Sequence, residues 1–296
     1  MGEVECVVPA GDWTGEGAVW HAGENALYWV DINRLLVHRY DPETKSTRSW
    51  FFDRPPAALA LTDRDDTLLV ALGGGLILWQ PANDARADFA EPETNWPDAR
   101  MNDGRPDPAG HFWVGTMFNN IGPDGATIDI ADEAAGRLFR VTANGASTVE
   151  KTGIGISNTF GWSPDRTRFY FGDTLLNTIF VWDYDAATGA ITNERPFFTG
   201  FDRGLPDGSV IDSEGYLWNA RYGGGCIVRV DPSGAVDRVI DMPVDNITTC
   251  TVGGPDLKTL YVTTAAKGVA QRYGGGLFAL RTDVAGLPEN RFRLSG

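Results

Sequence analysis

Four oxygen-bearing side chains in this sequence share a local context, each being a carboxylate or an amide beside a glycine or in a turn-like run. They are Glu16 in Thr14–Gly17, Asn102 in Arg100–Gly104, Asn158 in Ser157–Gly161 and Asp207 in Leu205–Gly208. Asn, Asp and Gly are common in tight loops that lead into strands, which accounts for any one of these residues by itself. As a group, their oxygens are ligands that suit a hard cation. That chemistry requires elements that bring the four together.

A repeated pattern along the chain predicts such elements. Two large apolar residues, a β-former and then small or polar residues recur six times, at separations of 41 to 57 residues. The copies are Leu27–Val30, Leu68–Ala71, Phe112–Gly115, Phe169–Gly172, Leu217–Ala220 and Leu260–Thr263. Each copy follows a cluster of turn residues and precedes another strand-like run. The period is typical of a propeller blade and too long for a leucine-rich or helical repeat.

The repeat predicts an all-β fold, a six-bladed β-propeller whose four-stranded blades surround a central channel. It occupies the whole chain, so residues 1–296 are expected to form one domain without a linker. A closed ring of blades also solves the problem of exposed sheet edges. A β-sandwich with many short strands is the alternative, but it would not need a fixed period.

The position of the polar residues within the repeat predicts a metal site. Counting back 10 or 11 residues from each copy reaches the expected start of the innermost strand beside the channel. The residues found there are Glu16, Ala57, Asn102, Asn158, Asp207 and Cys250. Equivalent positions around a propeller axis converge, and converging carboxylate and amide oxygens repel unless a cation lies among them. With Glu16, Asn158 and Asp207 as direct ligands, coordination positions stay open for water and substrate, as in a catalytic site.

One connection is unusually long for a compact blade. The segment from Met117 to Gly136 in the third repeat is polar and glycine-rich, and it carries Asp129, Asp132 and Glu133. Because strands alternate in direction, we expect it to emerge on the same face as the starts of the inner strands. A loop of this length is usually a lid or a binding loop. The alternative is a solvated loop with no contact to a ligand.

The amino-acid composition restricts the classes of binding partner and the cellular compartment that we expect. Twenty-five Lys and Arg residues against 40 Asp and Glu residues give a net charge of −15, so nucleic acid and anionic membrane surfaces are unlikely partners. No apolar run is long enough to span a bilayer, and the first ten residues lack the basic region of a secretory signal. Three cysteines without metal-site spacing favour a reducing cytoplasm. We expect a monomer or a weak oligomer that binds a small molecule.

Four motifs together resemble the regucalcin/gluconolactonase family of the senescence-marker-protein type. They are Gly15-Glu16-Gly17 with Val19-Trp20, Arg100-Met101-Asn102-Asp103-Gly104 with Gly115-Thr116-Met117, Ser157-Asn158 with Gly161-Trp162-Ser163, and Pro206-Asp207-Gly208 with Asp212-Ser213-Glu214-Gly215. The resemblance spans the chain in the right order. It implies a six-bladed propeller that binds one divalent cation and hydrolyses sugar lactones.

The resemblance also implies roles for individual residues. Glu16, Asn158 and Asp207 would be the metal ligands, and Arg100 and Asn102 would contact the lactone and its hydroxyls. The family takes an acidic residue from the long loop, for which Asp132 and Glu133 are both candidates. The implied mechanism is metal-assisted ester hydrolysis, in which Asp207 or the metal activates the attacking water.

The implied substrate is an aldonolactone such as arabinono-, xylono-, galactono- or gluconolactone. Oxygen ligands suit Ca²⁺, Mg²⁺ or Mn²⁺ and do not exclude Zn²⁺ or Fe²⁺. Two other functions stay open, a related propeller hydrolase of the phosphotriesterase type and a noncatalytic calcium-binding propeller.

Overall fold

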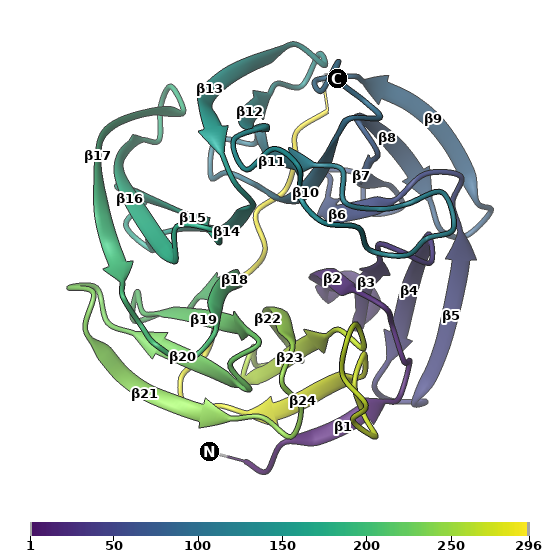
Figure 1. Cartoon of the computed structure of the whole chain (residues 1–296), viewed down its shortest axis with the longest axis vertical. Coiled ribbons are helices and arrows are strands. Elements are labelled where there is room, and N and C mark those ends of the chain that lie inside the picture. Colours follow the sequence, from purple (N-terminus) through teal and green to yellow (C-terminus); the bar gives the residue numbers. More distant parts are fainter. Residues whose placement is uncertain (1, 295–296) are drawn as a thin grey trace.

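Antiparallel strands make up most of the regular structure in the computed structural model, which describes residues 2–294 (Figure 1). They form six four-stranded sheets arranged as blades of a ring, so the predicted six-bladed β-propeller is confirmed. One short 3₁₀ turn, η1 (Ala22–Glu24), interrupts the first blade. Within residues 2–294, no helix is long and apolar enough to cross a membrane.

Each blade is built from consecutive strands, numbered outward from the channel in five of the six. Blades one to three consist of β2 (Gly15–His21), β3 (Ala26–Asp31), β4 (Leu36–Asp41) and β5 (Ser46–Phe51); β6 (Pro56–Leu61), β7 (Leu68–Leu72), β8 (Gly75–Gln80) and β9 (Ala85–Ala90); and β10 (Ala99–Pro106), β11 (Phe112–Phe118), β12 (Gly136–Val141) and β13 (Ser147–Ile154). Blades four to six consist of β14 (Ser157–Trp162), β15 (Arg168–Asp173), β16 (Thr178–Asp185) and β17 (Ala190–Thr199); β18 (Leu205–Ile211), β19 (Leu217–Tyr222), β20 (Cys226–Val230) and β21 (Val236–Asp241); and β22 (Ile247–Gly253), β23 (Thr259–Thr264), β24 (Leu277–Arg281) and β1 (Glu5–Val8). The six copies of the sequence repeat all lie in the second strand of a blade, as expected.

The N-terminal strand closes the ring. Strand β1 is the outermost strand of blade six and pairs antiparallel with β24, with Glu5 opposite Ala279 and Cys6 opposite Phe278. Blade six is therefore built from both ends of the chain. This arrangement covers the β24 edge, which would otherwise present unpaired backbone groups.

The hydrophobic core lies between neighbouring blades. Val19 and Tyr28 of blade one pack in one buried cluster with Leu59, Leu68 and Trp79 of blade two. Comparable buried clusters contain residues of blades two and three and of blades three and four. The alternation of the strands directs one face of each blade to each neighbour, so packing fixes the order and spacing of the inner strands around the axis.

Every inner strand has an irregular register near its start, on the side where the polar residues lie. The shift falls between Glu16 and Val19 in β2, and the other inner strands have equivalent shifts. A bulge of this kind re-aims the local side chains. In β18 it includes Gly208, where a β-carbon would collide with the Thr249 side chain of β22. Glycine thus allows the inner strands of blades five and six to approach closely.

We predict that the closing strand is required for stability. Deleting residues 2–9 removes β1 and leaves β24 as an open edge, so the melting temperature should fall and aggregation should increase. Deleting residues 2–4 leaves β1 in place and is the matched control. Thermal unfolding and light scattering measure the two effects. Equal melting temperatures for both deletions would show that β1 contributes nothing to closure.

Candidate active site

Two carboxylates from the inner strands of blades one and five meet in the channel. Glu16 of β2 and Asp207 of β18 are buried, and their carboxyl groups lie within hydrogen-bonding reach of each other. Burial, with the nearby Asp103 charge adding to it, raises the pKa of Glu16 to about 8. Burial and the charge of Glu16 raise the pKa of Asp207 well above its usual range. Two such groups hold a proton or a cation between them in preference to two unbalanced charges.

A third donor is oriented by a chain of hydrogen bonds. The Asn158 amide nitrogen donates to Thr174 Oγ1 at 2.8 Å, and that hydroxyl donates to the Pro206 carbonyl at 2.8 Å. With its nitrogen committed to Thr174, the amide presents its oxygen on the other side. There Asn158 Oδ1 accepts from Asn102 Nδ2 at 3.3 Å. The amide is thus held so that its oxygen serves as an acceptor or a ligand.

These residues fit a divalent cation by the chemistry of their donors. Two buried carboxylates with raised pKa values and one oriented amide oxygen form an all-oxygen set. Among residues 2–294, no group of three or more His, Cys, Asp and Glu side chains has the arrangement of a metal site. The set therefore depends on the amide of Asn158 as its third member.

Asp103 is a further buried carboxylate that the sequence analysis did not select as a site residue. Burial raises its pKa, while the charge of Arg105 and hydrogen bonds from the backbone of Gly104 and Thr159 oppose that shift. Its charge raises the pKa of both Glu16 and Asp207. Three carboxylates therefore share the channel and add to its need for positive charge.

A buried arginine borders this cluster. Arg100 Nη1 donates to Asn102 Oδ1 at 2.8 Å and to the Met101 carbonyl at 2.9 Å, and Nη2 donates to Asn120 Oδ1 at 2.9 Å. Burial lowers the pKa of Arg100 to about 10, so the guanidinium stays charged at neutral pH. Its hydrogen-bond acceptors are neutral, which leaves its charge available to a ligand.

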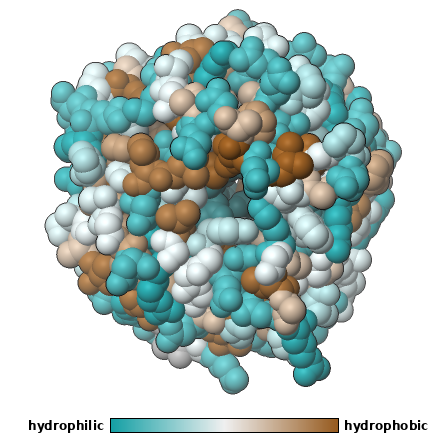
Figure 2. Space-filling model, in the orientation of Figure 1, coloured by the Kyte–Doolittle hydropathy of each residue, from teal (hydrophilic) through white to brown (hydrophobic). Residues whose placement is uncertain are grey.

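The long loop of blade three, residues 119–135, extends over blade two toward blade one, beside the channel (Figure 1). The Gly125 carbonyl accepts from Asn33 Nδ2 at 2.8 Å, and Thr127 Oγ1 accepts from Trp13 Nε1 at 3.2 Å. Ile121 packs against the core of blades one and two. Figure 2 shows this face of the molecule hollowed at its centre.

A second loop contributes to the mouth. Residues 265–276 connect β23 and β24 on the same face, and Asn246 Nδ2 anchors this loop by donating to the Lys267 carbonyl at 2.8 Å. Partial burial and the charge of Arg100 lower the pKa of Lys267, and the charge of Asp129 opposes the shift. Lys267 therefore brings a second cation near Arg100.

The structure brings together Glu16, Arg100, Asn102, Asn158 and Asp207, five of the residues selected from the sequence. Asp132 and Glu133 are exposed, and Asp132 lines a separate pocket beside Asp98 and Arg137 on blade three. The loop residue that contacts Arg100 is Asn120. Asn120 lies three residues after the Gly115-Thr116-Met117 motif, which was the available signal, but the family resemblance implied an acidic residue in this loop and Asn120 is an amide.

Known proteins are similar to this chain in sequence and in architecture. Residues 14–266 match the SMP-30/Gluconolactonase/LRE-like region. A pentonolactonase of Haloferax volcanii is 37% identical over 288 residues, which are 94% of each chain, and a regucalcin of Xenopus laevis is 33% identical, also over 94% of each. The crystal structure of a calcium-binding regucalcin from Agrobacterium tumefaciens superposes with a TM-score of 0.91 and 30% identity, covering 99% of this chain and 98% of that one.

We predict that the stability of the metal-free protein falls as the pH rises from about 4.5 to about 8. A carboxyl whose pKa is raised on folding binds its proton more tightly in the native state, so its stabilising contribution is present below the unfolded pKa of 4.5 and is lost as the pH approaches the folded pKa of about 8. Glu16→Gln removes this contribution and is the control. Thermal unfolding of both proteins across this pH range measures the difference.

Added Ca²⁺ or Mg²⁺ should raise the melting temperature of the wild type more at pH 8 than at pH 5, because protons compete with the cation for the same carboxylates. The Glu16→Gln variant should lose most of this response. A wild-type melting temperature that responds equally to the cation at both pH values, or not at all, would contradict the assignment of Glu16.

Proposed function

Because this chain belongs to the SMP-30/gluconolactonase/LRE-like family, we propose that it hydrolyses a sugar lactone at the mouth of its central channel. The observation that carries the proposal is the contact between two sets of residues. Glu16, Asn158 and Asp207 offer converging oxygens, and Arg100 and Asn102 lie directly beside them through the hydrogen bond from Asn102 to Asn158. The first set can bind a cation and the second can bind sugar hydroxyls. A hydroxylated ester can therefore contact both sets at once.

Arg100, Asn102 and Asn120 are proposed to bind the sugar hydroxyls. A guanidinium donates several hydrogen bonds in a fixed plane, and the two amides offer both donors and acceptors. Their present hydrogen bonds to one another hold these groups in place before the substrate enters. Such preorganisation reduces the entropy lost on binding. Asp132 and Glu133 of the same loop remain proposed contacts for hydroxyls farther from the ester.

A divalent cation held by Glu16, Asn158 and Asp207 would polarise the ester carbonyl and offset the negative charge that develops on its oxygen. Asp207 is proposed as the general base that accepts a proton from the attacking water. The water oxygen bonds to the carbonyl carbon, the bond to the ring oxygen breaks, and that oxygen takes up a proton to give the open-chain acid.

The proposed substrates are aldonolactones such as arabinono-, xylono-, galactono- or gluconolactone. The similarity to a pentonolactonase supports this class. The all-oxygen donor set favours Ca²⁺, Mg²⁺ or Mn²⁺, and Zn²⁺ or Fe²⁺ would also bind such ligands. A reducing cytoplasm remains our proposal for the compartment, and Cys6, Cys226 and Cys250 are free thiols in the structure.

A noncatalytic calcium-binding function is the second candidate, favoured by the description of the similar Agrobacterium protein as calcium-binding. Such a protein would bind the cation without turning over any lactone. A phosphotriesterase-type hydrolase would instead have little use for the polar group of Arg100, Asn102 and Asn120. Assaying a panel of aldonolactones and a phosphotriester, with and without chelator, distinguishes the three.

We predict that Asp207→Asn lowers kcat/KM for aldonolactones by roughly 10²-fold or more, since general-base catalysis typically contributes 10²–10⁴-fold. The metal-free variant should be at least as stable as the wild type because one of three repelling carboxylates is neutral. Asp202→Asn, an exposed position shortly before β18, is the control and should change neither quantity. Near wild-type turnover by Asp207→Asn would remove Asp207 from the mechanism.

We also predict that Asn120→Ala lowers kcat/KM for aldonolactones by about tenfold, the equivalent of roughly 1.4 kcal/mol for lost hydrogen bonds. Hydrolysis of an unhydroxylated lactone such as δ-valerolactone should change much less. Asp132→Asn and Glu133→Gln, assayed on the same two substrates, show whether the exposed acids contribute. If Asn120→Ala affects both lactones equally, the loop does not recognise hydroxyls through this residue.

A further inference from the structure

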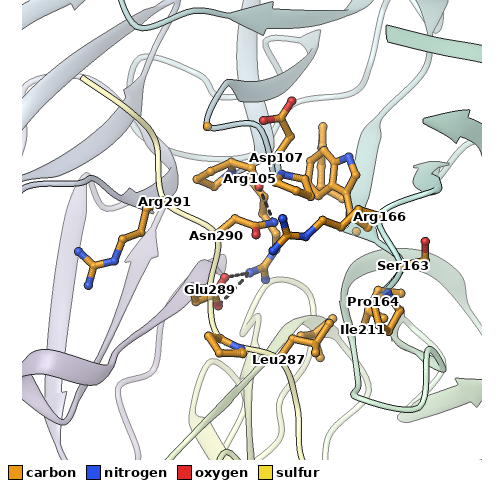
Figure 3. Close-up of a pocket in the computed structure, with 18 of the residues that line it drawn as sticks. Arg105, Asp107, Ser163, Pro164, Arg166, Ile211, Leu287, Glu289, Asn290 and Arg291 are labelled. Carbon is orange, nitrogen blue, oxygen red and sulfur yellow. Dashed lines mark hydrogen bonds and ion pairs between the residues drawn. The ribbon is translucent and has the colours of Figure 1, made fainter. Parts of the chain in front are cut away.

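A second pocket lies at the opposite end of the molecule from the candidate active site. Its volume is about 480 Å³, within the range of small-molecule sites. Phe160, Trp162 and Ile211 provide apolar walls, and Leu287 of the C-terminal segment (residues 282–294) provides another. Figure 3 shows the arrangement of the lining residues.

The C-terminal segment forms a fixed wall of this pocket. It crosses the far end of the channel (Figure 1, yellow), where the Gly286 amide donates to the Leu257 carbonyl at 2.7 Å. Farther along, the Phe292 amide donates to the Leu61 carbonyl at 2.8 Å and the Arg293 amide to the Gly110 carbonyl at 2.9 Å. Attachment to blades six, two and three holds the segment across the ring.

The pocket contains more guanidinium groups than free carboxylates. Arg105 Nη1 is paired with Glu289 at 3.1 Å. Figure 3 shows the Arg166 side chain extended into the pocket toward Asn290 and Arg105. In the part of the chain that the structure describes, the guanidinium groups of Arg166 and Arg293 have no hydrogen-bond or ion-pair partner, although both residues line the pocket.

Two carboxylates that also line the pocket accept hydrogen bonds from groups other than Arg166 and Arg293. Asp107 accepts from His111 Nδ1 and from Trp113 Nε1 at 3.0 and 2.9 Å. Asp63 accepts from the Leu294 amide at 3.2 Å. Arg291, also part of the lining, points away from the centre and pairs with Asp65. Two unpaired cations therefore face this cavity in a chain whose net charge is −15.

We propose that this pocket binds a small organic anion through a carboxylate or phosphate group. Guanidinium groups bind both by paired hydrogen bonds, and Arg166 and Arg293 are free to do so beside the paired Arg105. The apolar walls around Trp162 accommodate the body of the ligand. The proposal stands independently of the lactonase function, because it concerns other residues.

Arg105 separates this pocket from the carboxylate cluster. Its Nη2 atom donates to the Ala18 and Cys250 carbonyls at 3.5 and 3.4 Å, both on inner strands, and its charge acts on Asp103. Glu289 lies on its other side. The anion therefore binds beyond Arg105, away from Glu16 and Asp207.

Isothermal titration calorimetry on the metal-loaded, full-length protein tests the proposal. Inorganic phosphate and gluconate are titrated separately at constant ionic strength, with chloride as the reference anion. We expect one site per chain for at least one of the two probes. Binding of phosphate alone indicates a phosphate ester as the ligand, and binding of gluconate alone indicates a carboxylate.

Variants locate the site. The double substitution Arg166→Gln and Arg293→Gln should weaken binding at least fivefold without lowering the melting temperature. Arg64→Gln, an exposed arginine near the same end of blade two but outside the pocket lining, should bind like the wild type. The proposal is overturned if neither probe binds, or if the double variant binds with wild-type affinity, which would place the anion elsewhere, such as at the metal.

Discussion

The candidate active site depends on one constraint: buried carboxylates lie close together in the central channel and repel one another. Packing between blades fixes the inner strands, and their bulges direct Glu16, Asp103 and Asp207 inward, so the three charges cannot separate without opening the ring. Burial raises the pKa of all three carboxyl groups, and repulsion adds to this rise for Glu16 and Asp207. A fold that keeps such a cluster buried gains from any ligand that supplies positive charge. The fold thus accounts for the candidate metal site.

The blade repeat and the main polar residues could be predicted from the sequence because both follow from periodicity. Burial in the second strand of each blade requires the same apolar pattern, so copies such as Leu27–Val30 and Leu217–Ala220 recur in phase. A polar residue at a fixed distance before each copy must then lie near the axis. The count works for Glu16 and Asp207 because the hairpins between the first two strands differ little in length.

Other parts of the site depend on contacts that no repeat contains. Asn120 lies in a loop that occurs once, and its role follows from the path by which that loop returns to Arg100. The loop at residues 265–276 resembles turn sequence, and only its position places Lys267 near Arg100. Strand β1 and the C-terminal segment lie at opposite ends of the chain, where periodicity gives no information about pairing.

Arg105 links the two ends of the channel, because its guanidinium interacts with a carboxylate on each side. Arg105 faces Asp103 on one side and Glu289 on the other, so its one charge is divided between two carboxylates. It cannot neutralise the cluster around Glu16 and Asp207 as well, and that cluster retains its need for a cation. On the far side, Glu289 is already committed to Arg105 and to the Thr251 hydroxyl at 2.7 Å, which leaves no carboxylate of the C-terminal segment for Arg166. The same ion pair therefore leaves the carboxylate cluster at one end of the channel short of positive charge, and at the other end it makes Glu289 unavailable to Arg166.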